Sequence, residues 1–158
     1  MLYPGGAIAS DGGGWADENG LIGSDVWPLP EDAKSHPRAA GTYSKFLRVY
    51  VREREAVSLL EAIEKMSTIP ARILEESVPQ MRQKGRLQVG ADADIVVFDL
   101  NTVTDRATYE KPAQTSLGFE YVIVAGTPLV VEGELRTDVL PGRPVRRPVA
   151  VMAVEPIK

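Results

Sequence analysis

The sequence predicts an α/β part followed by an all-β part, with a boundary near residue 84. Between residues 42 and 84, apolar side chains recur at helical spacing, and residues that favour helix starts stand before them. From residue 85 onward, short runs of β-branched and aromatic residues alternate with turn residues. We therefore expect one strand, a loop and helices in residues 1–84, and strands in residues 85–158.

A short strand and a long loop are expected before the helices. Residues 3–10 have the small and apolar character of a buried strand, and this strand would end at Asp11. Residues 12–41 then form a loop rich in glycine, proline and acidic residues. Long loops in compact domains are usually functional or disordered, and Trp15 and Trp27 favour an ordered loop. These tryptophans either line a pocket for an apolar group or anchor the loop.

Three helices follow in the expected order. The first covers residues 43–54, with Thr42 as its cap and one apolar stripe. The second begins at Ser58, because Glu61 stands three residues later in a capping-box pattern.

The third helix is expected to begin at Thr68, with Pro70 in its first turn, where a missing N–H costs nothing. Val78-Pro79 ends or bends it. A polar linker over residues 80–84 completes the first part.

Three apolar runs predict the strands of the second part. Residues 95–98 form a continuous β-branched and aromatic run. Residues 121–125 and 129–132 form two more, joined as a hairpin through residues 126–128. A further turn is expected at Gly133-Glu134.

Composition restricts the chemistry of this chain. Its 158 residues carry a formal net charge of −4, no cysteine and one histidine, His36. Disulfides, cysteine-bound zinc and thiol catalysis are therefore excluded. The basic run over residues 143–147 is too short for a nucleic-acid surface, and we expect a solvated tail. No signal-peptide pattern or membrane-spanning stretch is present, so we expect a cytoplasmic protein without nucleic-acid or membrane partners.

Asp11 is the first candidate catalytic residue. A carboxylate at the end of a buried strand, before a glycine-rich loop, is where α/β barrels place catalytic groups. There it could bind a metal, take a proton from water and deliver it to a departing amine. The alternative is an ordinary turn aspartate without a catalytic role.

His36 and Arg38 are the candidate substrate-binding residues. Their imidazole and guanidinium groups stand on either side of Pro37, and an arginine can bind a carboxylate through two parallel hydrogen bonds. The alternative is a surface loop with a histidine of no special role.

Several motifs resemble the N-acyl-D-amino-acid deacylases, the D-aminoacylase branch of the metal-dependent amidohydrolase superfamily. The signature from Gly90 to Asp99 is common to many amidohydrolases, whereas the HPR and GTY motifs point to the deacylases. In order, the motifs are Ser10-Asp11-Gly12, His36-Pro37-Arg38, Gly41-Thr42-Tyr43, Phe46 to Glu53, Ala62 to Ser67, Pro70-Ala71, Lys84 to Asp99, Gly126 to Gly133 and Pro141-Gly142-Arg143.

The resemblance implies a fold and a division of the chain. Residues 1–84 would be the last strand, the long active-site loop and the closing helices of an incomplete (β/α)8 TIM barrel. Residues 85–158 would be part of the small β-sandwich beside that barrel. The chain would then be a fragment of the family's fold.

The resemblance also implies hydrolysis of the amide bond of N-acyl-D-amino acids with one or two zinc ions. Asp11 would be a metal ligand and the general acid/base at a metal-bound water, and His36 and Arg38 would lie beside the substrate. The family's histidine ligands are missing from this sequence. We therefore expect absent or weakly bound zinc, an inactive isolated chain, and either self-association or a requirement for a missing N-terminal half.

Two other hypotheses remain open at this point. One is a fragment of an amidohydrolase that acts on cyclic amides, like a hydantoinase or dihydroorotase. The other is a non-catalytic half of a split or truncated enzyme.

Overall fold

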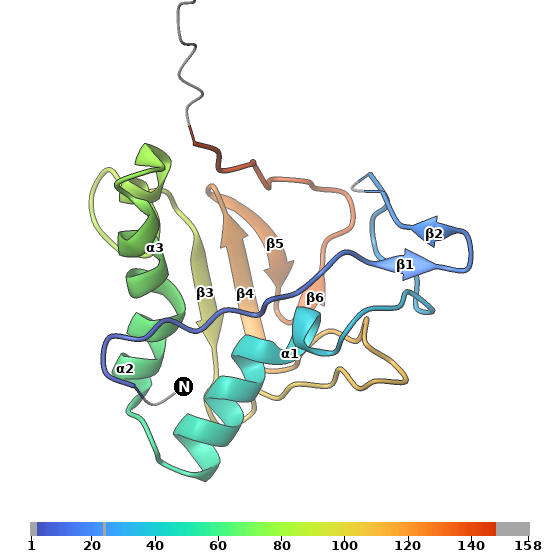
Figure 1. Cartoon of the computed structure of the whole chain (residues 1–158), viewed down its shortest axis with the longest axis horizontal. Helices are drawn as coiled ribbons and strands as arrows, with labels where there is room; N and C mark the ends of the chain where they lie inside the picture. The colour runs from blue at the N-terminus through green and yellow to red at the C-terminus, as the bar shows by residue number, and fades with distance from the viewer. Residues whose placement is uncertain (1–2, 24, 148–158) are drawn as a thin grey trace, which may run out of the picture.

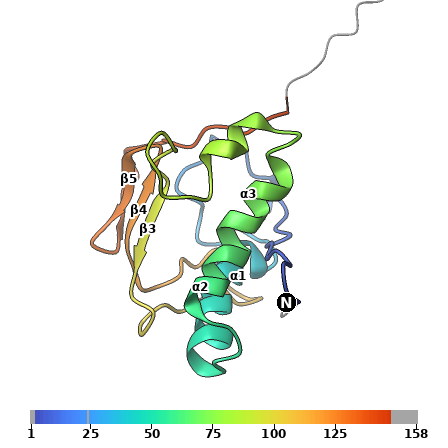
Figure 2. The same cartoon turned by 90° about the vertical axis from the view of Figure 1, so that its left-hand side faces the viewer.

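The computed structural model describes residues 3–23 and 25–147. The sheet forms one side of the molecule and the longer helical segments lie opposite (Figures 1 and 2). All helices of the described residues precede residue 84, and the larger sheet follows it. The two-domain division at residue 84 stays a prediction. Residues 148–158, at the end of the predicted β part, lie outside the described residues.

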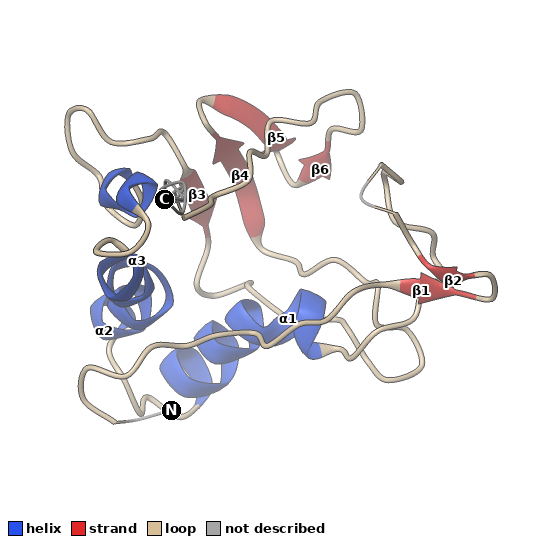
Figure 3. Ribbon diagram, turned by 45° about the horizontal axis from the view of Figure 1, so that its top comes forward, coloured by secondary structure: helices blue, strands red, loops and turns tan. Residues whose placement is uncertain are grey.

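The N-terminal segment, residues 3–10, is not a strand, and this prediction is wrong. A strand needs a neighbouring ladder, and no described strand pairs with this segment. Instead, Lys65 holds it at two points. The Lys65 Nζ donates to the Tyr3 carbonyl oxygen at 2.6 Å, and the Lys65 carbonyl oxygen accepts the N–H of Ile8 at 2.9 Å. The segment then runs on toward the loop (Figure 3).

The loop contains a small hairpin and is shorter than expected. Strand β1 (Ala16–Asp17) pairs antiparallel with β2 (Gly20–Leu21), and Ala16 also forms a bridge with Lys34. The loop ends at Pro37, because the first helix begins directly after it.

The first helix begins at Arg38, five residues before its predicted start. Helix α1 (Arg38–Lys45) continues into the π-helical segment η1 (Phe46–Glu53). Thr42 does not cap it, since its hydroxyl donates to the Arg38 carbonyl oxygen at 2.9 Å inside the helix. The N-cap residue is Pro37, which makes no side-chain cap hydrogen bond, and Nδ1 of the preceding His36 accepts the Arg38 N–H at 3.1 Å.

The predicted second and third helices form one continuous rod. Helix α2 (Leu59–Ile63), the π-helical segment η2 (Glu64–Thr68) and helix α3 (Ile69–Leu74) follow each other without a break. The cap at Ser58 is confirmed, because its hydroxyl oxygen accepts the N–H of Glu61 at 3.2 Å.

Thr68 is not a cap, because its backbone is helical. Its hydroxyl instead donates to the Gly85 carbonyl oxygen at 2.9 Å. Pro70 lies in the first turn of α3, as predicted, where its missing N–H costs nothing. The rod ends before Val78, and the polar linker is a 3-10 helix, η3 (Pro79–Gln83).

Four antiparallel strands form the larger sheet in sequence order. The two hairpin turns, Ala125-Gly126 and Glu132-Gly133, have positive φ at both central residues, as the twist of two-residue hairpins requires. Both turns lie slightly earlier than predicted. The strands are β3 (Ile95–Phe98), β4 (Phe119–Val124), β5 (Thr127–Val131) and β6 (Glu134–Leu135).

Asp94 links the helical part to the first hairpin of the sheet. Its Oδ1 accepts the N–H of Ala125 at 2.8 Å, and its Oδ2 lies 2.6 Å from the Lys84 Nζ. Burial acts to raise the pKa of Asp94, but these two hydrogen bonds and the Lys84 charge together lower it below its ordinary value. Asp94 and Asp92 in turn raise the pKa of Lys84.

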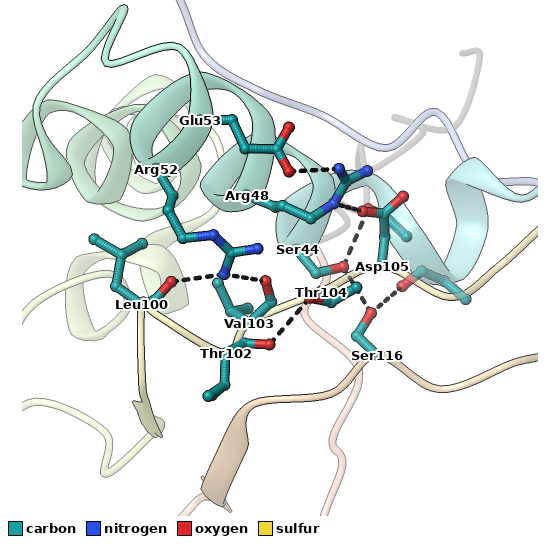
Figure 4. A network of polar contacts seen from close by, with 12 residues as sticks. Ser44, Arg48, Arg52, Glu53, Leu100, Thr102, Val103, Thr104, Asp105 and Ser116 are labelled. Atoms are coloured by element: carbon teal, nitrogen blue, oxygen red, sulfur yellow. Dashed lines mark hydrogen bonds and ion pairs between the residues drawn. The ribbon is translucent and has the colours of Figure 1, made fainter.

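One face of the first helix binds the segment that connects β3 to β4. Three side chains at four-residue spacing, Ser44, Arg48 and Arg52, make the contacts (Figure 4). Arg48 Nε donates to Asp105 at 2.7 Å, and Asp105 and Glu53 raise the pKa of Arg48. Arg52 Nη1 donates to two backbone carbonyl oxygens at 2.8 Å each. These contacts attach the segment between β3 and β4 to the first helix.

The buried core lies where the N-terminal segment, the helices and the connecting segment meet. A cavity of about 1690 Å³ lies between the helices and the sheet and is lined by residues of both. It is called the larger cavity below. Within the described residues, no helix is long and apolar enough to cross a membrane. The core residues are Ile8, Phe46, Leu47, Val51, Val57, Ala62 and Val103.

Candidate functional site

Asp11 lies at the point where the N-terminal segment turns into the loop. Its φ of 47° is in the left-handed region, which aspartate tolerates better than most residues. Its side chain is 90% exposed, so the carboxylate is open to a ligand or to water. As predicted from the sequence, Asp11 stands directly after the N-terminal segment and before the loop, although that segment is not a strand.

Arg38 contacts Asp11 at two atoms. The Arg38 Nε donates to the Asp11 carbonyl oxygen at 2.8 Å, and Nη2 lies 3.2 Å from Oδ2 of the carboxylate. The backbone contact fixes the chain at Asp11, and the ion pair places a positive charge beside its side chain. Because Arg38 is the first residue of α1, the start of this helix and the candidate carboxylate are held together.

His36 uses both ring nitrogens in polar contacts. Nδ1 accepts the backbone N–H of Arg38 at 3.1 Å, and Nε2 lies 3.1 Å from the hydroxyl oxygen of Tyr109. The two rings meet edge to face, with centroids 5.1 Å apart. Tyr109 belongs to the segment between β3 and β4, so distant parts of the chain meet at this site.

A pocket of about 560 Å³ lies beside these groups. His36, Arg38 and Tyr109 contribute to its wall, together with charged residues of both signs, and Asp11 is not among its lining residues. The pocket therefore adjoins the Arg38 guanidinium, while the carboxylate of Asp11 faces open solvent.

Sequence reasoning missed Tyr109 and Asp105. Asp105 pairs with Arg48, and its segment carries Tyr109 toward His36. Neither residue stands in a motif or near the candidate residues in the sequence. Their role depends on chain folding, and no local pattern indicated it.

The two loop tryptophans do not line either of the two cavities described above. The Trp15 carbonyl oxygen accepts the N–H of Ile22 at 2.8 Å, across the β1–β2 hairpin. Trp27 is 38% exposed. The Trp15 contact is made by its backbone and Trp27 is exposed, so both interpretations of these side chains stay predictions.

The described residues do not fit a zinc site by themselves. Zinc sites in proteins usually use three or four nitrogen, sulfur or carboxylate ligands. In residues 3–23 and 25–147, no three histidine, cysteine, aspartate or glutamate side chains lie close enough to hold a metal ion. The Asp11 carboxylate is paired with Arg38, and both nitrogens of His36 are engaged.

Comparison with known protein families gives the class of the protein. The sequence model of the amidohydrolase family matches residues 14–130, and the chain belongs to this family. The matched stretch includes His36 and Arg38 and begins after Asp11.

The more specific relationship is to deacylases of N-acyl-D-amino acids. The chain is 42% identical over 131 residues to the N-acyl-D-glutamate deacylase of Alcaligenes xylosoxydans xylosoxydans. It is 39% identical over 122 residues to the N-acyl-D-aspartate deacylase of the same organism. These matches cover 83% and 77% of this chain, but only 25% and 23% of the relatives. The chain thus spans about a quarter of their length.

Solved structures give the same relationship. The N-acyl-D-glutamate deacylase of Bordetella bronchiseptica, solved with zinc and a phosphonate inhibitor, matches with a TM-score of 0.67 and 34% identity. That match covers 92% of this chain and 26% of the other. A D-aminoacylase structure matches with a TM-score of 0.66 and 31% identity, over 89% of this chain and 25% of the other. The likeness to these deacylases expected from the motifs is confirmed.

Proposed function

We propose that this chain forms one part of the active site of a metal-dependent deacylase of N-acyl-D-amino acids, and that it is inactive alone. The observation that carries the proposal is the contact of Arg38 with both the backbone and the carboxylate of Asp11. The similarity to three deacylases or aminoacylases of D-amino acids supports the substrate class.

Asp11 is the proposed general acid/base. Hydrolysis of an amide requires removal of a proton from the attacking water and delivery of a proton to the departing amine nitrogen. An exposed carboxylate can accept the first proton and then donate it. The product carboxylate and the free D-amino acid then leave.

Arg38 is the proposed binding group for the carboxylate of the substrate. A guanidinium has five N–H donors, and the contacts with Asp11 use two of them. Arg38 also lines the pocket of about 560 Å³, where a substrate carboxylate could accept its remaining donors. His36 supports this arrangement from the pocket wall.

The zinc ligands other than Asp11 are proposed to come from outside this chain, because no three histidine, cysteine, aspartate or glutamate side chains of the described residues lie close enough to hold a metal ion. In amide hydrolysis, a bound zinc polarises the carbonyl group and lowers the pKa of water. The large difference in length between this chain and its relatives supports a site completed by further polypeptide.

The substrate class is tested with a fusion protein. Residues 3–147 replace the matching quarter of the N-acyl-D-glutamate deacylase, and the fusion is assayed with N-acetyl-D-amino acids, their L enantiomers and hydantoin. We expect turnover of D substrates only. Turnover of hydantoin instead would favour the cyclic-amide hypothesis and contradict the proposal.

The incompleteness of the chain is tested with the unfused protein. We expect no stoichiometric zinc by elemental analysis and no deacylation. Stoichiometric zinc with turnover that is lost in the Asp11→Ala variant would contradict the need for further polypeptide.

A further inference from the structure

We propose that His36 and Tyr109 are a positioning pair that fixes Arg38, and through it Asp11. The inference rests on the proposed function, which gives Arg38 and Asp11 their importance. It assigns a role to His36 that differs from direct substrate binding, and it adds Tyr109, which stands in no motif.

The hydrogen bonds of His36 determine its tautomer. Nδ1 accepts the N–H of Arg38 and therefore carries a lone pair. A neutral imidazole has its proton on the other nitrogen, so Nε2–H donates to the Tyr109 hydroxyl oxygen, 3.1 Å away. Neither nitrogen then has a lone pair free for a metal, because Nδ1 is used and Nε2 is protonated.

The consequence for Arg38 follows from helix geometry. The first N–H groups of a helix lack partners inside the helix, and a side-chain acceptor that binds one of them fixes the start of the helix. Here the acceptor is the His36 ring, so the ring determines where the Arg38 backbone begins α1. The Arg38 side chain then contacts Asp11 at two atoms. A shift of the His36 ring would therefore also shift the Asp11 carboxylate.

Tyr109 holds the ring from the opposite side. Its segment is fixed to the first helix by the Asp105–Arg48 ion pair, and Thr108 and Lys111 close a turn around it. The edge-to-face contact and the hydroxyl contact both restrict rotation of the His36 ring. The segment between β3 and β4 therefore contributes to the geometry of the site at the other end of the chain.

Nuclear magnetic resonance of the isotope-labelled chain tests this directly, because His36 is the only histidine and its ring gives one set of signals. At about pH 8.5 a histidine ring is neutral. We expect the ring proton on Nε2. We also expect the Arg38 Nε–H to exchange slowly with water. A ring proton on Nδ1 would overturn the proposal.

Two matched variants separate positioning from simple loss of the ring. In His36→Asn, the side-chain oxygen stands near the place of Nδ1 and can still accept the Arg38 N–H. In His36→Gln, the amide reaches the place of Nε2 and cannot. We expect exchange of the Arg38 Nε–H to stay near the wild-type rate in the first and to rise about tenfold in the second. Equal rates in the two variants would overturn the proposal.

The role of Tyr109 is tested with Tyr109→Phe, which removes only the hydroxyl. Tyr43→Phe is the control, because Tyr43 lines the larger cavity instead. We expect the His36 Nε2 signal to move in Tyr109→Phe and to stay in the control. An unchanged Nε2 signal in Tyr109→Phe would remove Tyr109 from the pair. None of these measurements needs metal or turnover, so an inactive fusion would contradict the proposed function alone.

Discussion

Arg38 holds Asp11 by its backbone as well as by its charge. The Arg38 Nε donates to the Asp11 carbonyl oxygen at 2.8 Å, while Nη2 lies 3.2 Å from the carboxylate. An exposed ion pair alone is worth little, because water and salt screen it. The additional contact stabilises the backbone at Asp11, whose φ of 47° is rare for residues other than glycine. The pair therefore orders the chain at the candidate carboxylate.

Replacement of Arg38 should loosen this part of the loop. In Arg38→Lys, the ammonium group cannot reproduce the two contacts at fixed angles. We expect amide hydrogen exchange of Gly12, whose N–H donates to Ser10 Oγ, to rise about tenfold, while the free energy of unfolding falls by less than about 1 kcal/mol. Arg136→Lys is a matched control, because Arg136 forms an exposed pair with Asp138 elsewhere. Unchanged exchange in Arg38→Lys would show that the contact does not order the loop.

Gly12 is expected to resist a larger side chain. A Cβ at this position would lie 3.1 Å from the Ala39 Cα and 3.3 Å from its Cβ, so the loop or the helix must move. At Gly13, nothing lies within 4 Å of the added atom. Thermal unfolding should show that Gly12→Ala lowers the free energy of unfolding by about 1 kcal/mol and that Gly13→Ala leaves it almost unchanged. The reverse order would contradict the close approach of the loop to α1.

Lys84 should stabilise the chain in a defined pH range. Asp94 has a lowered pKa, so its contribution is present above the ordinary value of 3.8 and is lost as the pH falls through the lower folded value. Lys84 has a raised pKa, so its contribution is present below 10.5 and is lost as the pH rises through the folded value.

We therefore expect Lys84→Met to reduce the free energy of unfolding by about 1 kcal/mol near neutral pH. The difference from wild type should shrink below pH 3.8 and above pH 10.5. Lys111→Met, at an exposed lysine without an ion pair among the described residues, is the control. Denaturant unfolding across the pH range measures both. A difference that does not vary with pH would contradict the ionic origin of this stabilisation.

Arg52 is expected to contribute more stability than an exposed arginine. Its Nη1 donates to the carbonyl oxygens of Leu100 and Val103, which belong to a partly buried connection. Arg52→Met leaves both oxygens without this donor and should cost about 2 kcal/mol of unfolding free energy. Arg72→Met, on the exposed side of α3, should cost less than about 0.5 kcal/mol. Equal losses would mean that the contacts in Figure 4 do not hold the two segments together.

Gly118 should be the least replaceable glycine of the sheet part. Its φ is +84°, and an added Cβ would lie 2.5 Å from the Val103 backbone. Gly126 has a similar φ of +81°, but nothing lies within 4 Å. Calorimetry should show that Gly126→Ala lowers the free energy of unfolding by about 1 kcal/mol, from backbone strain alone. Gly118→Ala should lower it by more than about 3 kcal/mol. Similar losses would contradict the steric explanation.

The features that the sequence predicted correctly depend on neighbouring residues. Glycine at the two hairpin turns, the run over residues 95–98 and the Ser58 cap are local signals, and the structure contains all three. The start of the first helix was missed because its first N–H binds the His36 ring, and histidine is not among the usual residues at helix starts.

Features that depend on distant contacts were missed or wrong. Residues 3–10 have the composition of a strand, but a strand also needs a paired neighbour. Tyr109 lies 73 residues from His36, and only the folded chain brings them together. The candidate residues Asp11, His36 and Arg38 were predicted from motifs, and the structure places them in one connected group. Their catalytic and binding roles stay predictions.

The most direct measurement of the central claim is the kcat of the fusion protein with Asp11→Asn. Asp17→Asn is the control, because it makes the same change at another loop aspartate. We expect Asp11→Asn to reduce kcat on the best N-acetyl-D-amino acid at least about 100-fold, with little change in KM, and the control to stay near wild type. A kcat within about threefold of wild type in Asp11→Asn would contradict the role of Asp11 as general acid/base.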